Sequence, residues 1–201
     1  MIKNVVFDFG QVLVHFDPAY MARQYVTNEE DALLLERVAF DRLYWDALDA
    51  GTISQEAVVE ACRTRLPSHL WEVAEKLIWN WIYLIPPMEG MNEVVLHLKH
   101  TYGVKLFLLS NISLYFAEHA CEFPILAEMD RCIFSSVCGY TKPSKEIFAY
   151  LCESCEIDPA QTLFVDDNAA NVAAAEKMGI KTYHFDGNAA KLREYLDELL
   201  K

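Results

Sequence analysis

Short apolar runs recur along the chain, and several of them end in polar residues. Three such runs cover residues 2–8, 104–111 and 162–167, and two shorter ones cover 132–134 and 180–184. Their apolar residues occupy consecutive positions rather than alternate ones. This pattern is typical of strands that are buried on both faces, as in a parallel sheet covered by helices.

Helical segments separate these runs. We expect helices at residues 89–100, roughly 113–121, 144–152, 169–178 and 188–199. Strands that alternate with helices predict an α/β fold with a Rossmann-like parallel sheet. Because ligands in open sheets of this kind bind at the carboxyl ends of the strands, the polar residues that follow the apolar runs are the candidates for chemistry.

The block from residue 18 to about 85 looks helical nearly throughout and contains no strand. Thr27 and Glu30 have capping-box spacing, which predicts that a helix begins after Thr27. We interpret the block as an insertion that forms a cap over one edge of the sheet. The expected units are an α/β core of residues 1–16 and 87–201 and a helical cap of residues 17–86.

All four tryptophans lie in this insertion. Aromatic residues at helical spacing usually form core or helix–helix contacts. We therefore expect most of them to be structural, with one or two facing the cleft between cap and core: Trp45, Trp71, Trp79 and Trp81.

The net charge of −13 over 201 residues, from 17 basic and 30 acidic side chains, limits the partners of the chain. Such a surface repels nucleic acid and anionic membranes, although local cations, a metal or helix N-termini can still hold a small anion. The longest apolar stretch, residues 77–88, is too short to span a bilayer. We expect a cytoplasmic protein, monomeric or homodimeric, whose six cysteines are reduced.

The candidate chemistry gathers at three strand ends and one helix start. Carboxylates there can bind a hard cation such as Mg²⁺, the hydroxyl and backbone amides can hold anionic oxygens, and the lysine can balance the charge. A carboxylate nucleophile beside a metal is a known route to a covalent intermediate. The residues are Asp8, Ser110, Asn111, Lys142, Asp166 and Asp167.

Four segments at these positions resemble the four motifs of the haloacid dehalogenase superfamily. They occur in that family's order and spacing and read FDFGQVL, LLSN, KP with its following helix, and FVDDNAANVAAA. The helical insertion also follows the first motif, as the cap does in that family. The resemblance covers essentially the whole chain.

The resemblance implies a role for each matched residue. Asp8 would be the nucleophile that forms an aspartyl-phosphate. Ser110 would bind the phosphoryl group, with Asn111 shaping the same loop and contributing to substrate binding. Lys142 would bind substrate and stabilise the charge of both nucleophile and phosphate. The substrate would then be a small phosphorylated metabolite.

The resemblance also implies a Mg²⁺ site made by Asp8, the backbone carbonyl of Gly10, Asp167 and Asp166, the last binding directly or through water. The superfamily contains both metal-dependent phosphatases and metal-free dehalogenases, and Asp8 does not distinguish them. Two adjacent carboxylates at a strand end are costly without a cation. The pair Asp166–Asp167 therefore favours the phosphatase.

Gly10 departs from the family pattern, in which an aspartate at this position protonates the leaving oxygen and activates water. General acid–base help is typically worth about 10²–10⁴-fold. His15 and Asp17 are the nearest titratable candidates to supply it, although Asp17 more simply caps the helix that begins at Pro18. His15 is also a candidate to bind substrate. The pattern D-x-G-x-V-L resembles a branch of the family with sugar-phosphate phosphatase activity, including glucose-1-phosphate hydrolysis. Two alternatives stay open: a catalytically weak phospho-ligand-binding regulator and a metal-independent 2-haloacid dehalogenase.

Overall fold

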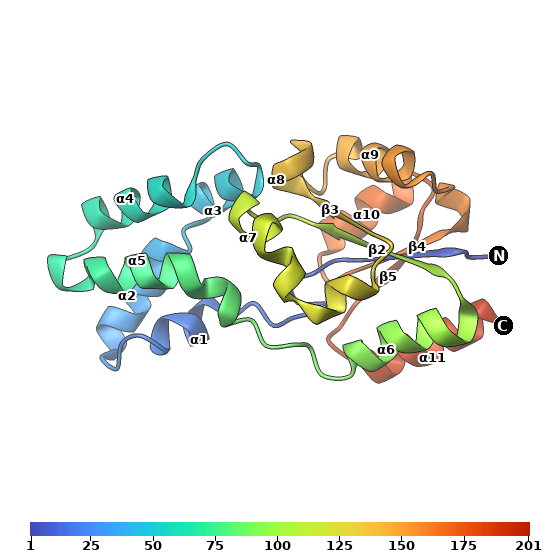
Figure 1. Ribbon diagram of the computed structural model, residues 1–201, viewed down its shortest axis with the longest axis horizontal. Coiled ribbons are helices and arrows are strands. Elements are labelled where there is room, and N and C mark those ends of the chain that lie inside the picture. Colours follow the sequence, from blue (N-terminus) through green and yellow to red (C-terminus); the bar gives the residue numbers. More distant parts are fainter.

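The computed structural model describes residues 1–201 and has one sheet of five parallel strands in the order β3-β2-β1-β4-β5 (Figure 1). The central strand β1 pairs in register with both neighbours, so that Val5 lies opposite Leu106 and Leu163. The strands are β1 (Asn4–Phe7), β2 (Lys105–Ser110), β3 (Arg131–Phe134), β4 (Thr162–Asp166) and β5 (Lys181–His184). The parallel α/β sheet expected from the apolar runs is confirmed.

Helices cover both faces of this sheet. Phe7 of β1 faces a cluster of 40 buried residues that includes α6 (Met91–His97) and α11 (Ala189–Leu200). Val6, one residue earlier, faces a separate cluster of 12 buried residues with α9 (Lys145–Cys155) and α10 (Ala169–Lys177). Because successive residues of a strand point to opposite faces, burial on both sides explains why the strands are apolar throughout.

Shorter helical turns connect these elements. They are the π-helical turn η3 (Leu98–Tyr102), α7 (Leu114–His119), η4 (Ala120–Glu122), η5 (Pro124–Glu128), α8 (Ser135–Cys138) and η6 (Pro159–Gln161). None of the helices is both long and apolar enough to cross a membrane.

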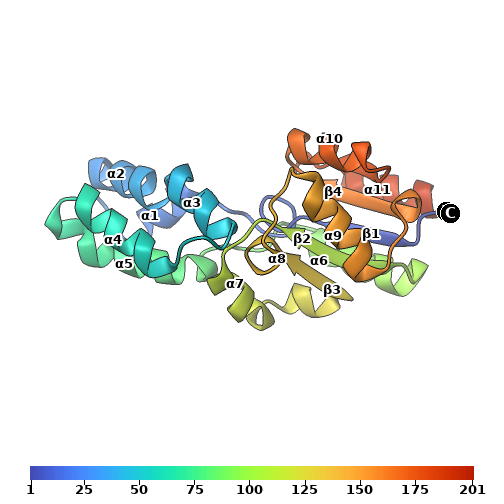
Figure 2. The ribbon, with the colours of Figure 1, turned by 90° about the horizontal axis from the view of Figure 1, so that it is seen from above.

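A lobe of helices projects from one end of the sheet (Figures 1 and 2). This helical lobe, residues 18–83, contains α1 (Pro18–Arg23), α2 (Glu29–Ala39), α3 (Arg42–Asp49), α4 (Gln55–Arg65), η1 (Ser68–Leu70), α5 (Trp71–Asn80) and η2 (Trp81–Tyr83). It has no strand, as the sequence pattern indicates. The 40-residue cluster contains residues of the lobe as well as of the sheet, so both are packed on one apolar core.

The start of α2 corrects a detail of the sequence-based prediction. The N-cap is Asn28, whose side chain accepts a hydrogen bond from the Asp31 amide at 3.0 Å, and Thr27 lies one residue before this cap. Asparagine is at least as good an N-cap as threonine, and here its oxygen reaches the third helical amide.

The two chain segments that join lobe and sheet pair with each other. The His15 amide donates to the Pro86 carbonyl at 2.8 Å, and the Met88 amide donates to the Leu13 carbonyl at 2.9 Å. Val14 and Pro87 form an antiparallel bridge between them. The lobe is therefore tethered by a short two-stranded ribbon.

Candidate active site

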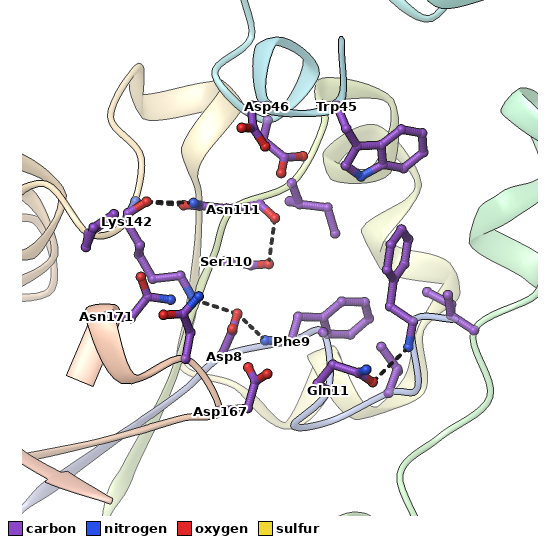
Figure 3. A pocket seen from close by; sticks show the side chains of 18 of the residues that line it. Asp8, Phe9, Gln11, Trp45, Asp46, Ser110, Asn111, Lys142, Asp167 and Asn171 are labelled. Carbon is purple, nitrogen blue, oxygen red and sulfur yellow. Dashed lines mark hydrogen bonds and ion pairs between the residues drawn. The ribbon is translucent and has the colours of Figure 1, made fainter. Parts of the chain in front are cut away.

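Asp8 stands directly after β1, at the carboxyl end of the central strand. Its amide donates to the Val165 carbonyl at 2.9 Å, which extends the β1–β4 ladder by one residue and fixes the start of the following turn. Its Oδ1 accepts a hydrogen bond from the Phe9 amide at 2.7 Å and lies 2.7 Å from the Lys142 ammonium (Figure 3). Both contacts involve the same oxygen, so Oδ2 is left for a cation or a substrate.

Lys142 is a buried cation between two carboxylates. It is 5% exposed, and its Nζ lies 2.7 Å from Asp8 and 2.8 Å from Asp166. Asn111 holds the backbone of Lys142 from both sides, because its Nδ2 donates to the Lys142 carbonyl at 2.9 Å and its Oδ1 accepts from the Lys142 amide at 2.8 Å. The Asn111 amide thus shapes the loop that carries the lysine.

For both Lys142 and Asp8, burial shifts the pKa in one direction and the opposite charge of the partner shifts it in the other. Burial would lower the pKa of Lys142, but the charges of Asp8 and Asp166 outweigh it and raise that pKa. Burial raises the pKa of Asp8 to about 7, with Lys142 opposing the rise and Asp166 adding to it. The lysine is therefore charged, and the carboxylates around it are held at an energetic cost that a further cation would relieve.

Asp166 is the most enclosed acid of the site, with 0% of its surface exposed. One oxygen accepts from the Asn168 amide at 2.8 Å, and the other contacts Lys142. Asn171 donates to both oxygens, at 3.1 and 3.0 Å. With both oxygens engaged, Asp166 is placed to orient Lys142.

Asp167 is half-buried and follows β4. Burial raises its pKa, and the adjacent Asp166 adds to the increase. The ring of His184 donates from Nε2 to the Asp167 carbonyl at 2.8 Å, which ties the turn to the end of β5. The carboxyl group therefore projects from a backbone that is fixed on the core side.

The three acids of the site lie close enough together to bind one divalent cation. Carboxylate oxygens of Asp8, Asp166 and Asp167 lie within 4.8 Å of one another. When all three are ionised, they and the Lys142 ammonium carry a formal net charge of −2. Oxygen ligands and this charge match Mg²⁺, which binds through a few carboxylates and keeps several waters.

A cavity of about 320 Å³ opens above these residues, between the core and the helical lobe. Ser110, at the end of β2 and 2% exposed, is among its lining residues, with its hydroxyl in only a long 3.5 Å contact to the Asn111 carbonyl. The structure thus brings the expected core residues to one cavity: Asp8, Gly10, Ser110, Asn111, Lys142 and Asp167, with Asp166 directly behind them.

The lobe contributes side chains that the sequence did not single out. Arg42, Asp46 and Asp49, all on α3, line the cavity opposite the core acids. Figure 3 shows Asp46 and Trp45 above Ser110 and Asn111. Charged residues of one helix are usually solvated, and no local pattern in DRLYWDALDAG marks them as facing a site.

Two of the four tryptophans, Trp45 and Trp81, also line the cavity, as expected for one or two of them. Their rings pack against each other with centroids 5.5 Å apart. Trp71 and Trp79 lie outside the cavity lining. The aromatic pair forms an apolar wall beside the acidic residues.

The structure does not bring His15 to this cavity. Its side chain is exposed and lies beside a separate surface hollow that Asp17, Tyr20 and Pro86 also line. Its amide is used in the ribbon that tethers the lobe. This placement gives no support to the expectation that His15 binds substrate or transfers a proton at Asp8.

Comparison with known proteins identifies relatives of the whole chain. Residues 2–179 match the family model of haloacid dehalogenase-like hydrolases. A D-ribitol-5-phosphate phosphatase from Bacteroides thetaiotaomicron is 27% identical over 211 residues, covering 100% of this chain and 99% of the relative. A sesquiterpene phosphatase from Aspergillus oryzae is 24% identical, covering 96% and 94%.

Solved structures share the fold. A HAD-like hydrolase from Porphyromonas gingivalis superposes with a TM-score of 0.74 at 23% identity, covering 100% of this chain and 99% of that one. A mutant HAD family enzyme from Bacteroides thetaiotaomicron, in complex with magnesium and inorganic phosphate, gives 0.72 at 20% identity, covering 94% and 96%. An L-2-haloacid dehalogenase from Xanthobacter autotrophicus gives 0.65 at 19%, covering 98% and 88%. The fold alone therefore does not separate the two chemistries.

Proposed function

The chain belongs to the haloacid dehalogenase-like hydrolase family, and we propose that it is a Mg²⁺-dependent phosphatase that cleaves a small phosphomonoester through an aspartyl-phosphate on Asp8. The observation that carries this proposal is the cluster of Asp8, Asp166 and Asp167 around Lys142, with its net charge of −2. Such a cluster favours a divalent cation, which hydrolytic dehalogenation does not use. Phosphatases among the relatives support the same conclusion.

The residues of the chain divide the work. Asp8, the Gly10 carbonyl and Asp167 would hold the cation, and Asp166 would support it through water. When bound, Mg²⁺ neutralises the charge of the phosphoryl oxygens. Ser110 and Lys142 bind the same oxygens and hold phosphorus in line with Asp8, which is the main source of catalysis in phosphoryl transfer.

The reaction then has two steps. A carboxylate oxygen of Asp8 attacks phosphorus, and the bond to the leaving oxygen breaks. Water next attacks the aspartyl-phosphate, releases inorganic phosphate and regenerates Asp8. Lys142, fixed by Asn111 and Asp166, stays charged throughout and balances the negative charge that both steps concentrate at phosphorus.

For the substrate we propose a sugar or polyol phosphate. The cavity of about 320 Å³ suits a small metabolite, and Asp46 and Asp49 offer acceptors for hydroxyl groups while disfavouring a second anionic group. The ribitol-5-phosphate activity of the bacterial relative supports this class. We also propose that residues 17–86 act as a cap domain on a core of residues 1–16 and 87–201, because α3 covers the site.

The test is hydrolysis of a phosphate panel and of 2-haloacids, with Mg²⁺ and with EDTA. We expect phosphate release from the panel, its loss in EDTA, and its loss in Asp8→Asn, which keeps the shape of the side chain without the nucleophile. Metal-independent halide release would instead identify a dehalogenase. Phosphate binding without turnover would identify the regulator.

A further inference from the structure

The core of the active site has a glycine, Gly10, where a side chain could begin without a close contact, and it offers no separate group for proton transfer. Gly10 lines the cavity two residues after the nucleophile. A Cβ built there would meet only the Cβ of Phe16, at 4.0 Å. The leaving oxygen of an alkyl phosphate needs a proton as the phosphorus bond breaks, so another group has to provide it.

Six titratable side chains line the cavity, and most have another task. Three belong to the core and serve as nucleophile, buried cation and metal ligand: Asp8, Lys142 and Asp167. The other three lie on α3 of the lobe. Arg42 does not give up its proton in proteins. Asp46 is paired with it, at 3.0 Å between Nε and Oδ1. Of these three, only Asp49 has no hydrogen bond or ion pair to its side chain.

Resting on the proposed phosphatase function, we infer that Asp49 is the general acid and base of this enzyme and takes the role that Gly10 cannot fill. It reaches the reaction from the lobe rather than from the core. The two carboxylates Asp8 and Asp49 would then act on opposite sides of phosphorus, one attacking it and the other serving the leaving oxygen.

The surroundings of Asp49 suit this role. Burial raises its pKa to about 7, and Asp46 adds to the rise while Arg42 opposes it. Across the cavity, Asp8 adds to it and Lys142 opposes it, with smaller effects. A general acid or base works best when its pKa lies near the operating pH.

The backbone at Asp49 is fixed to the core. The Ser135 hydroxyl, at the start of α8, donates to the Asp49 carbonyl and accepts a hydrogen bond from the Ile112 amide at 2.9 Å. Two residues on, Gly51 packs so closely that a Cβ there would lie 2.6 Å from the Ser136 carbonyl oxygen. These contacts hold the end of α3 in one position above the site.

The proposed proton transfers balance in both steps. As the Asp8 oxygen bonds to phosphorus and the leaving oxygen departs, the Asp49 carboxyl gives that oxygen its proton, producing an alcohol and the Asp49 carboxylate. In the second step this carboxylate takes a proton from water while the water oxygen bonds to phosphorus. The bond between phosphorus and Asp8 breaks, and Asp49 is again protonated.

The experiment compares kcat/KM for two substrates, 4-nitrophenyl phosphate and an alkyl phosphate such as ribitol 5-phosphate, in wild type and in Asp49→Asn. 4-Nitrophenolate can leave without being protonated, whereas an alkoxide needs a proton as it leaves. We expect the loss for the alkyl phosphate to exceed that for the aryl phosphate by about 10²-fold or more. Because kcat/KM reports the step in which the leaving group departs, slow hydrolysis of the intermediate does not obscure the comparison.

Two further variants sharpen the result. Asp46→Asn, on the same helix and in the same cavity, removes a proposed hydroxyl acceptor but no proton donor, so it should lower kcat/KM for the alkyl phosphate far less than Asp49→Asn does. Gly10→Asp, combined with Asp49→Asn, should raise the alkyl-phosphate activity of the single variant at least tenfold, because a Cβ at Gly10 makes no close contact and its carboxyl would stand two residues from the nucleophile.

Equal losses on both substrates in Asp49→Asn, or a change in KM alone, would overturn the role of Asp49. So would a double variant that turns over 4-nitrophenyl phosphate but shows no recovery on the alkyl phosphate. A wild-type enzyme that hydrolyses neither substrate would overturn the phosphatase function itself.

Discussion

At the scale of single residues, Lys142 links all parts of the site. Its ammonium contacts Asp8 and Asp166, while its backbone is held by Asn111. It also lies over the Phe164 ring, with Nζ 5.5 Å from the centroid. A cation held on several sides is already in position for an anionic substrate.

Replacing Lys142 with methionine should both inactivate and destabilise the protein. The side chain keeps its length but leaves Asp8 and Asp166 as buried, unpaired carboxylates. Removing one partner of a buried ion pair costs about 3–5 kcal/mol. Denaturant unfolding without Mg²⁺ would measure this loss.

Lys99→Met is the matched control for that measurement. Lys99 pairs with Glu128 at 2.9 Å, but both side chains are partly exposed, at 42% and 33%. An exposed pair is worth roughly 0–1 kcal/mol. Equal losses in the two variants would contradict the importance of burial at Lys142.

At the scale of elements, the contact between α3 and α8 positions the lobe over the core. Gly51 makes this contact possible in two ways. Its φ of +69° lies in the left-handed region, and its missing side chain leaves space for the Ser136 carbonyl. Any larger residue would both strain the backbone and clash with the Ser136 carbonyl.

We therefore expect Gly51→Ala to lower the free energy of unfolding by more than the strain of a left-handed backbone alone would. The strained conformation costs about 1–2 kcal/mol, and forcing an atom into a packed contact adds roughly 1–3 kcal/mol. Displacement of α3 should also lower kcat/KM for alkyl phosphates. Urea unfolding and the phosphatase assay measure the two effects.

Gly103→Ala separates the two contributions. Gly103 has a φ of +60°, yet a Cβ added there would meet no atom within 4 Å. Only the backbone cost should appear there. If Gly51→Ala were no more destabilising than Gly103→Ala, the close approach to α8 would not contribute to the destabilisation.

The same elements show how far the sequence could predict the site. Asp8, Ser110 and Asp167 follow apolar strands, and parallel strands bring their carboxyl ends to one edge, so these residues could be placed together in advance. Asp49 could not, because its position depends on how the lobe docks on the core through Ser135 and Gly51. A tertiary contact of this kind leaves no periodic pattern in the sequence. His15 lies away from the cavity for a related reason, since nearness along the chain does not fix where a side chain points.

At the scale of the whole molecule, lobe and core share one apolar cluster of 40 buried residues. Because the lobe and the core are packed on one apolar cluster, we expect them to unfold together. A cation bound at Asp8 and Asp167 should therefore stabilise the entire chain, and not only the loops that touch it.

This stabilisation should depend on pH. The pKa of Asp8 rises from its ordinary 3.8 to about 7 on folding. Ionising Asp8 in the folded protein therefore costs stability as pH rises from about 4 to 7, and the full cost applies above 7. Mg²⁺ binds the ionised form, so it should raise Tm more at pH 8 than at pH 5. At 100 times Kd the gain is about 2.7 kcal/mol.

Calorimetry at the two pH values, with Mg²⁺ and with EDTA, measures this difference. Asp167→Asn, which removes a proposed ligand, should reduce the Mg²⁺-induced shift at pH 8. A shift of the same size at both pH values would contradict a cation site that includes Asp8.

The paired ribbon that tethers the lobe has a consequence for the history of the fold. The chain leaves the core at Val14 and returns at Pro87, which form a bridge with each other. Bridged backbones lie about 5 Å apart, a gap that a two-residue turn can close. A segment with such neighbouring ends can be gained, lost or exchanged for another without moving β1 or β2. The specificity of this architecture can therefore evolve by replacement of whole modules, while the chemistry at the strand ends stays the same.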